Sequence, residues 1–75
     1  MSEIIQDIID EFGNKPLHDI ELQYLIVEHR ELHNPWLVHI WDNKGNLLTY
    51  DYRSHKQAVR MVAGLKEVGV AEGTL

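Results

Sequence analysis

Residues 36–52 constrain the fold of this chain more than any other segment, because one turn sorts their side chains onto two faces. The run Asp42-Asn43-Lys44-Gly45-Asn46 predicts a type I turn closed by Gly45 in the left-handed region, so that Asp42 pairs with Asn46. Counting outward from the turn predicts these cross-strand pairs: Ile40 with Leu48, Val38 with Tyr50 and Trp36 with Tyr52 on one face, and Trp41 with Leu47, His39 with Thr49 and Leu37 with Asp51 on the other. A slip by one residue would exchange the two faces, so the pattern and the turn together predict one register, with strands over about residues 36–42 and 46–53.

An earlier strand is predicted over about residues 20–30, where Ile20, Leu22, Tyr24 and Ile26 occupy alternate positions. An amphipathic helix over residues 19–33 is the alternative, since several apolar residues in that range also follow a helical spacing. Alternation and β-branched content favour the strand, whose apolar side would extend the face that carries Val38 and Ile40.

Two helices flank the predicted strands. The first covers about residues 3–12, where isoleucines recur at helical spacing before Gly13 stops the helix. The second covers about residues 55–68, with Ser54 and Gln57 as a capping box and Gly69 as the left-handed stop. Its predicted buried stripe consists of Ala58, Val59, Val62 and Leu65, with Met61 and Val68 at its margins.

The predicted fold class is therefore α+β, a single α-β-β-β-α domain over residues 1–75 in which a three-stranded antiparallel meander packs with two helices. Residues 71–75 show no anchoring pattern, and we expect this tail to be frayed.

Composition indicates the cellular location that we expect for the chain. It contains no cysteine, no apolar run long enough for a membrane helix and no basic start of a signal peptide, so we expect a soluble, unprocessed cytoplasmic protein that does not bind membranes. The net charge of −5 is uneven: residues 1–31 hold eight acidic and two basic residues, whereas residues 32–75 hold four acidic and five basic residues.

The strongest candidate for a metal site is the pair His29 and His33, because histidines four apart share a helix face. Glu31 lies midway between them, whereas zinc-protease motifs need the glutamate next to a histidine. The segment also follows a predicted strand, so exposed loop histidines are the better interpretation. No nucleophile motif or phosphate-binding glycine loop is present either, and we expect no metal ion, no cofactor and no enzymatic activity.

The face of the sheet opposite the second helix is the main candidate binding surface. It would carry Leu37, His39, Trp41 and Leu47, joined by apolar residues of the first strand. Three arrangements are open: the first helix covers this face, two copies pack through it, or another protein docks there.

Two charged surfaces are the alternatives to this face as binding sites. Lys56, Arg60 and Lys66 could form a basic stripe for nucleic acid on the last helix, although the acidic composition disfavours that partner. The first helix could instead present an acidic face to a basic partner, made of Glu3, Asp7, Asp10 and Glu11. The sequence thus favours a small protein-interaction module, a regulator or inhibitor of a kind common among phage and mobile-element accessory proteins, that binds another protein or itself.

Overall fold

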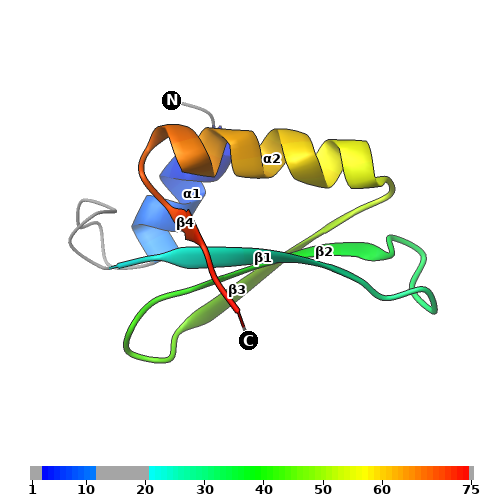
Figure 1. Ribbon diagram of the computed structural model, residues 1–75, viewed down its shortest axis with the longest axis horizontal. Coiled ribbons are helices and arrows are strands. Elements are labelled where there is room, and N and C mark those ends of the chain that lie inside the picture. Colours follow the sequence, from blue (N-terminus) through cyan, green and yellow to red (C-terminus); the bar gives the residue numbers. More distant parts are fainter. Residues whose placement is uncertain (1–2, 12–20, 75) are drawn as a thin grey trace.

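A mixed four-stranded sheet with both helices on one side forms the fold, which confirms the predicted α+β class (Figure 1). The computed structural model describes residues 3–11 and 21–74. The elements are α1 (Glu3–Glu11), β1 (Gln23–Glu28), β2 (Trp36–Trp41), β3 (Leu47–Tyr52), α2 (His55–Glu67) and β4 (Ala71–Glu72). The strand order is β3-β2-β1-β4, in which β1 to β3 are antiparallel and β4 runs parallel to β1.

The β2–β3 hairpin has the predicted register, with Trp36 opposite Tyr52 and Trp41 opposite Leu47. The turn is closed as expected: Asp42 N donates to Asn46 O at 3.1 Å, and Gly45 has a φ of 92°. The pairing of β1 with β2 matches Tyr24 with Ile40, so the apolar side of β1 continues the same face. The helical alternative for this segment is therefore wrong, although the strand is shorter than the predicted residues 20–30. Ile20 lies outside the described residues.

The turn contains a buried carboxylate that the pattern analysis did not single out. Asp42 is only 7% exposed, and its side chain accepts hydrogen bonds from Lys44 N, Asn46 N and Asn46 Nδ2 at 2.7–2.9 Å. Burial alone would raise the pKa of Asp42, but these hydrogen bonds and the nearby Lys44 charge outweigh it and lower the pKa below its ordinary value of 3.8. The ionised carboxylate therefore stabilises the turn.

Because the folded-state pKa of Asp42 is depressed, its contribution to stability is present above pH 3.8 and is lost as the pH falls below that value. We expect Asp42→Asn to destabilise the protein at neutral pH, and the difference from wild type to shrink in acid. Urea unfolding at about pH 7 and about pH 3 measures both values. A difference that stayed constant between these pH values would contradict the stabilising role of the charge.

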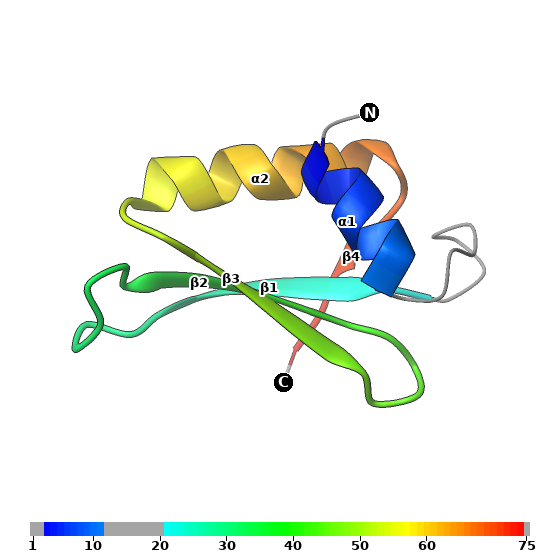
Figure 2. The ribbon, with the colours of Figure 1, turned by 180° about the vertical axis from the view of Figure 1, so that it is seen from behind.

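The hydrophobic core lies between the sheet and the two helices, on the face that we call the inner face. Ile8 of α1 is fully buried there, and α2 contributes Ala58, Met61, Val62 and Leu65. The sheet, the residue before β1 and the α2–β4 turn supply the remaining buried core residues: Leu22, Tyr24, Val38, Ile40 and Val70. Since Ile8 joins the same core as α2, α1 packs on the inner face, and the predicted option that it covers the opposite face is wrong (Figure 2).

Helix α2 begins at the predicted residue and ends at Glu67, one residue before the predicted position 68, and its buried stripe differs from the prediction at Val59. The capping box of Ser54 and Gln57 is formed, and after the helix Val70 N donates to Leu65 O at 3.0 Å. Val59, which was predicted to be buried, is 43% exposed, whereas Met61, which was predicted at the margin of the stripe, is only 8% exposed. Val59 and Met61 lie about 200° apart around the helix, so only one of them can face the sheet.

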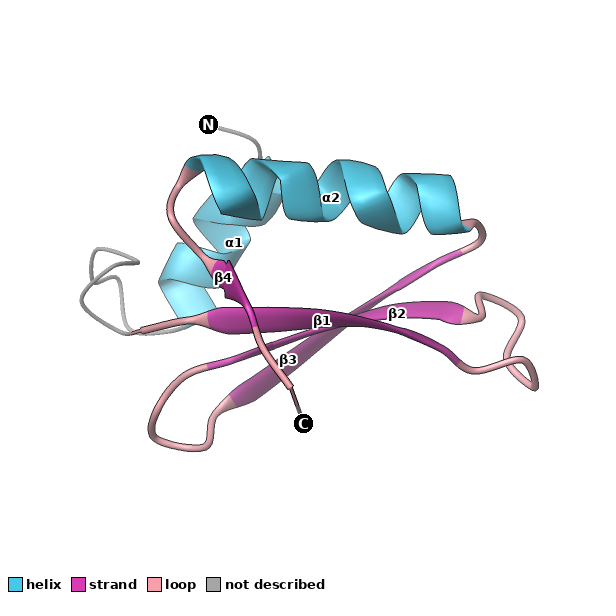
Figure 3. Ribbon diagram, in the orientation of Figure 1, coloured by secondary structure: helices cyan, strands magenta, loops and turns pink. Residues whose placement is uncertain are grey.

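The predicted frayed tail is also wrong, because residues Ala71–Glu72 form β4 beside β1. Gly69, with a φ of 91°, reverses the chain after α2 and directs it back across the sheet (Figure 3). Gly73 N then donates to Tyr24 O at 2.8 Å and is itself buried. The anchor is therefore a backbone contact with a strand far away in the sequence, which leaves no local pattern in residues 71–75.

Candidate functional site

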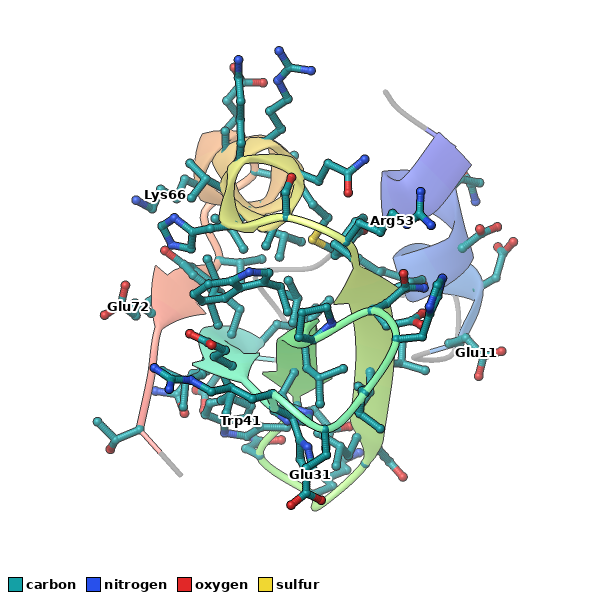
Figure 4. All side chains as sticks on the ribbon, turned by 90° about the vertical axis from the view of Figure 1, so that its right-hand side faces the viewer. Glu11, Glu31, Trp41, Arg53, Lys66 and Glu72 are labelled. Carbon is teal, nitrogen blue, oxygen red and sulfur yellow. The ribbon has the colours of Figure 1, made fainter. Side chains whose placement is uncertain are left out.

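The side of the sheet that faces away from both helices is the candidate binding surface, and we call it the outer face. Strand alternation places on it all four predicted interaction residues, together with two apolar residues of β1. Among the described residues, no helix or strand packs over this face, and Figure 4 shows Trp41 on the opposite side of the sheet from α2. The apolar and aromatic members of the outer face are Leu25, Val27, Leu37, His39, Trp41 and Leu47.

Leu47 is the most exposed of these residues, at 56%, while the other five are partly buried by their neighbours on the strands. The β1–β2 pairing puts Leu25 beside His39 and Val27 beside Leu37, and the β2–β3 pairing puts Trp41 beside Leu47. The apolar side chains therefore form one continuous surface across three strands rather than isolated exposed residues. Contiguous apolar surface of this kind is typical of interaction sites.

Three hydrogen bonds between side chains on different segments hold the polar groups of the outer face in place. The indole Nε1 of Trp41 donates to Gln23 Oε1 at 3.1 Å. His39 Nδ1 and Thr49 Oγ1 lie 2.9 Å apart, and the third bond, also 2.9 Å long, runs from Asn34 Nδ2 to the Asp51 carboxylate. Since each bond fixes a side chain before any ligand arrives, the surface loses little conformational freedom on binding.

The chain after β4 reaches the edge of this surface at Trp41. A Cβ atom placed on Gly73 would lie only 2.6 Å from Trp41 Cζ2 and 3.0 Å from Gln23 Cβ. Gly73 is therefore packed directly against the indole ring, and the absence of a side chain permits this approach. Sequence analysis missed both Gln23 and Gly73, because neither the parallel β4 pairing nor the side-chain bond to Trp41 leaves a local signal.

The predicted acidic face lies on α1, close to β3. Asp7, Asp10 and Glu11 are exposed, whereas the side chain of Glu3 is outside the described part of the chain. Burial is the largest cause of the raised pKa of the Tyr50 hydroxyl on β3, and the negative charges of Asp7 and Glu11 raise it further. These two carboxylates therefore lie near the inner side of β3, away from the outer face.

The predicted basic stripe is only partly assembled. Lys56, Arg60 and Lys66 are all exposed on α2. Lys56 and Arg60 share one side of the helix, but Lys66 lies about 80–120° around the axis from them, and Glu67 projects within about 20° of their direction. Two cations followed by an acidic residue give a weak contact surface for a phosphate backbone.

The histidines of the metal hypothesis lie in the loop between β1 and β2, as predicted, and both are exposed. His33 Nε2 accepts a hydrogen bond of 3.4 Å from Arg53 Nη2, and His29 N donates to Pro35 O. Within residues 3–11 and 21–74, no three His, Cys, Asp or Glu side chains are grouped closely enough to hold a metal ion. His55, at the start of α2, instead packs on Trp36 with a ring separation of 4.6 Å.

A surface hollow of about 350 Å³ lies at one end of the sheet. It is lined by Glu21, Leu22, Gln23, Asn43, Gly69 and Ala71. Of the described residues in this lining, Glu21 alone is titratable, and its carboxylate accepts a hydrogen bond from Asn43 Nδ2 at 3.1 Å. The lining therefore offers no pair of groups for general acid–base chemistry.

Comparison with known proteins gives no further assignment: no family model, curated protein or solved structure matches this chain. Neither of the described helices has the length and apolar character needed to cross a bilayer.

Proposed function

We propose that this protein is a non-enzymatic interaction module that binds another protein through the outer face of its sheet. The observation that carries the proposal is the burial of Ile8 in the same core as α2, which places both helices on the inner face. The outer face is then left without a covering layer among the described residues. A regulator or inhibitor of this kind acts by occupying a surface of its partner.

The composition of the outer face suits a protein partner. Trp41 is a residue type that often dominates binding energy at protein interfaces. Leu47 lies opposite it on β3, and Leu37 lies four residues away on β2, beyond His39. Asp51 is the only charged side chain that β1, β2 and β3 direct to this side. A surface without cations does not favour a nucleic acid, whose binding depends on contacts between basic residues and phosphates.

The variant Leu37→Lys tests the proposal. Lysine at this position lies directly opposite Asp51 on β3, so a cross-strand ion pair should preserve the fold while a charge is introduced into the apolar surface. We expect the variant to lose the partner that wild-type protein retains in a pull-down from its native cells. Circular dichroism and thermal melting should show that the variant stays folded.

Val59→Lys is the matched control, because Val59 is 43% exposed on α2 and the change adds the same charge on the other layer of the protein. This variant should retain the partner, and retention should differ little between about 50 and 300 mM salt, since apolar contacts are not screened. If Leu37→Lys retains the same partner as wild type, the outer face is not the binding surface. A partner lost only at high salt would point instead to a charged surface.

A further inference from the structure

The outer edge of β3 carries backbone groups that no other described strand pairs with. In an antiparallel pair, residues that exchange backbone hydrogen bonds alternate with residues that do not. The bond from Asp42 N to Asn46 O sets this alternation in the β2–β3 pair, so the backbone groups of Leu48, Tyr50 and Tyr52 point to β2. Those of Leu47, Thr49 and Asp51 point away from the sheet, and no strand among the described residues pairs with them.

The two edges of the sheet differ in how far they are paired. On the β1 side, β4 adds two residues in parallel, and Gly73 N then donates to Tyr24 O at 2.8 Å. On the β3 side, the edge strand LLTYDY is paired with β2 over all six residues. It contains no proline, lysine or bulge, which commonly protect an edge from pairing with other chains, and its one charged residue is Asp51.

Acidic side chains of α1 flank this open edge. Asp7 and Glu11 lie about 40° apart around the helix and about 60–100° from the direction of the buried Ile8, and their charges contribute to the raised pKa of Tyr50. In Figure 4 the strands follow one another from β4 to β3, and Glu11 lies beyond β3 on its open side. The edge therefore combines free backbone donors and acceptors with negative charge above them.

We propose that the outer edge of β3 binds an extended segment of a partner protein by strand addition, and that this segment alternates apolar and basic residues. Backbone hydrogen bonds would form with Leu47, Thr49 and Asp51. Side chains of the added strand that point to the inner side would lie beside Tyr50 and below α1, where Asp7 and Glu11 favour Lys or Arg. Side chains that point to the outer side would lie beside Leu47 and extend the apolar outer face.

Charge complementarity selects this ligand over a second copy of the chain. If two β3 strands paired about a two-fold axis, the two α1 helices would meet above the shared seam. Asp7 and Glu11 of one copy would then face the same carboxylates of the other, which is unfavourable. A basic segment meets the same carboxylates with the opposite charge.

Strand addition at β3 would use backbone groups at one edge of the sheet, whereas the proposed function uses side chains on the outer face. The two sites can also be tested separately. Leu37→Lys alters side chains on the outer face and leaves the outward-pointing backbone groups of β3 unchanged, whereas blocking those backbone groups leaves Leu37 and Trp41 unchanged.

The probe is a fluorescein-labelled peptide of about seven residues that alternates valine and lysine between terminal threonines, titrated with the full chain and followed by fluorescence anisotropy. We expect saturable binding that weakens as salt rises. Glu11→Lys should weaken binding by about tenfold or more, whereas Asp10→Lys, on the solvent side of α1, should change it by less than about threefold. Both substitutions change the net charge by the same amount, and both residues lie at the C-terminal end of α1.

Backbone methylation of the peptide provides a test that needs no protein variant. Methyl groups on the alternate amides that would face β3 should abolish binding, while methyl groups on the intervening amides should not. Amide exchange measured by NMR should slow at Leu47, Thr49 and Asp51 when the peptide binds. Equal affinity of the two methylated peptides, equal effects of the two α1 variants, or no saturable binding would overturn the proposal.

Self-association of the protein through the same edge would also overturn it. Sedimentation of the protein without peptide, at several concentrations, would then show a dimer that Thr49→Pro converts to a monomer. We expect a monomer under these conditions.

Discussion

An Ile8→Ala variant is expected to lose about 2–5 kcal/mol of unfolding free energy, the usual cost of removing most of a buried isoleucine from a packed core. Ile8 is fully buried between α1 and the sheet. Since small domains are stable by only roughly 0.05–0.15 kcal/mol per residue, this loss would be a large share of the total stability. Urea unfolding followed by far-ultraviolet circular dichroism measures it.

Val59→Ala is the control for this measurement, because it removes an aliphatic side chain that is 43% exposed on α2. It should change the stability by no more than about 0.5 kcal/mol. If the two variants cost the same, α1 is not held on the inner face by Ile8. The main support for an uncovered outer face would then be lost, because α1 would be free to pack elsewhere.

The central hairpin could be predicted from the sequence because its determinants are local. The turn at Gly45 and the alternation on both sides of it lie within one short segment, and they agree on one register. The same is true of α2, where the cap at Ser54 and the stop at Gly69 adjoin the helix. Local backbone preference and side-chain pattern were therefore sufficient for these elements.

The position of α1 could not be predicted in this way. Its apolar stripe fits any apolar surface, and the meander offers one on each side: Val38 and Ile40 on the inner face, and Leu37 and Trp41 on the outer face. The choice depends on how the whole chain packs. Strand β4 was missed for a related reason, because its pairing with β1 joins residues about 48 positions apart and rests on backbone groups.

In the candidate site, too, some features could be predicted from local sequence and others depended on long-range pairing. The four predicted residues of the outer face do lie together, because strand alternation fixes their side. Their polar partners could not be predicted, since Gln23 and Gly73 approach Trp41 only through the β1–β2 and β1–β4 pairings. A sequence pattern can thus assign a residue to a face, whereas the contacts around it depend on the neighbouring strands.

Gly45→Val is expected to destabilise the protein by about 1–3 kcal/mol, because Gly45 has a φ of 92° and a β-branched residue strongly resists that conformation. A Cβ atom at this position would meet no other atom within 4 Å, so the loss would come from the backbone and not from a clash. In a domain of this size, each kcal/mol corresponds to a fall in Tm of roughly 4–8 °C.

Gly45→Asn separates the backbone effect from the loss of glycine itself. Asparagine tolerates positive φ angles better than other residues that carry a side chain, so this variant should lose less than about half as much stability as Gly45→Val. Thermal melting of both variants gives the comparison. Equal melting temperatures for wild type and Gly45→Val would mean that the turn does not fix the hairpin register, and the assignment of Leu37, His39, Trp41 and Leu47 to one face would then lose its basis.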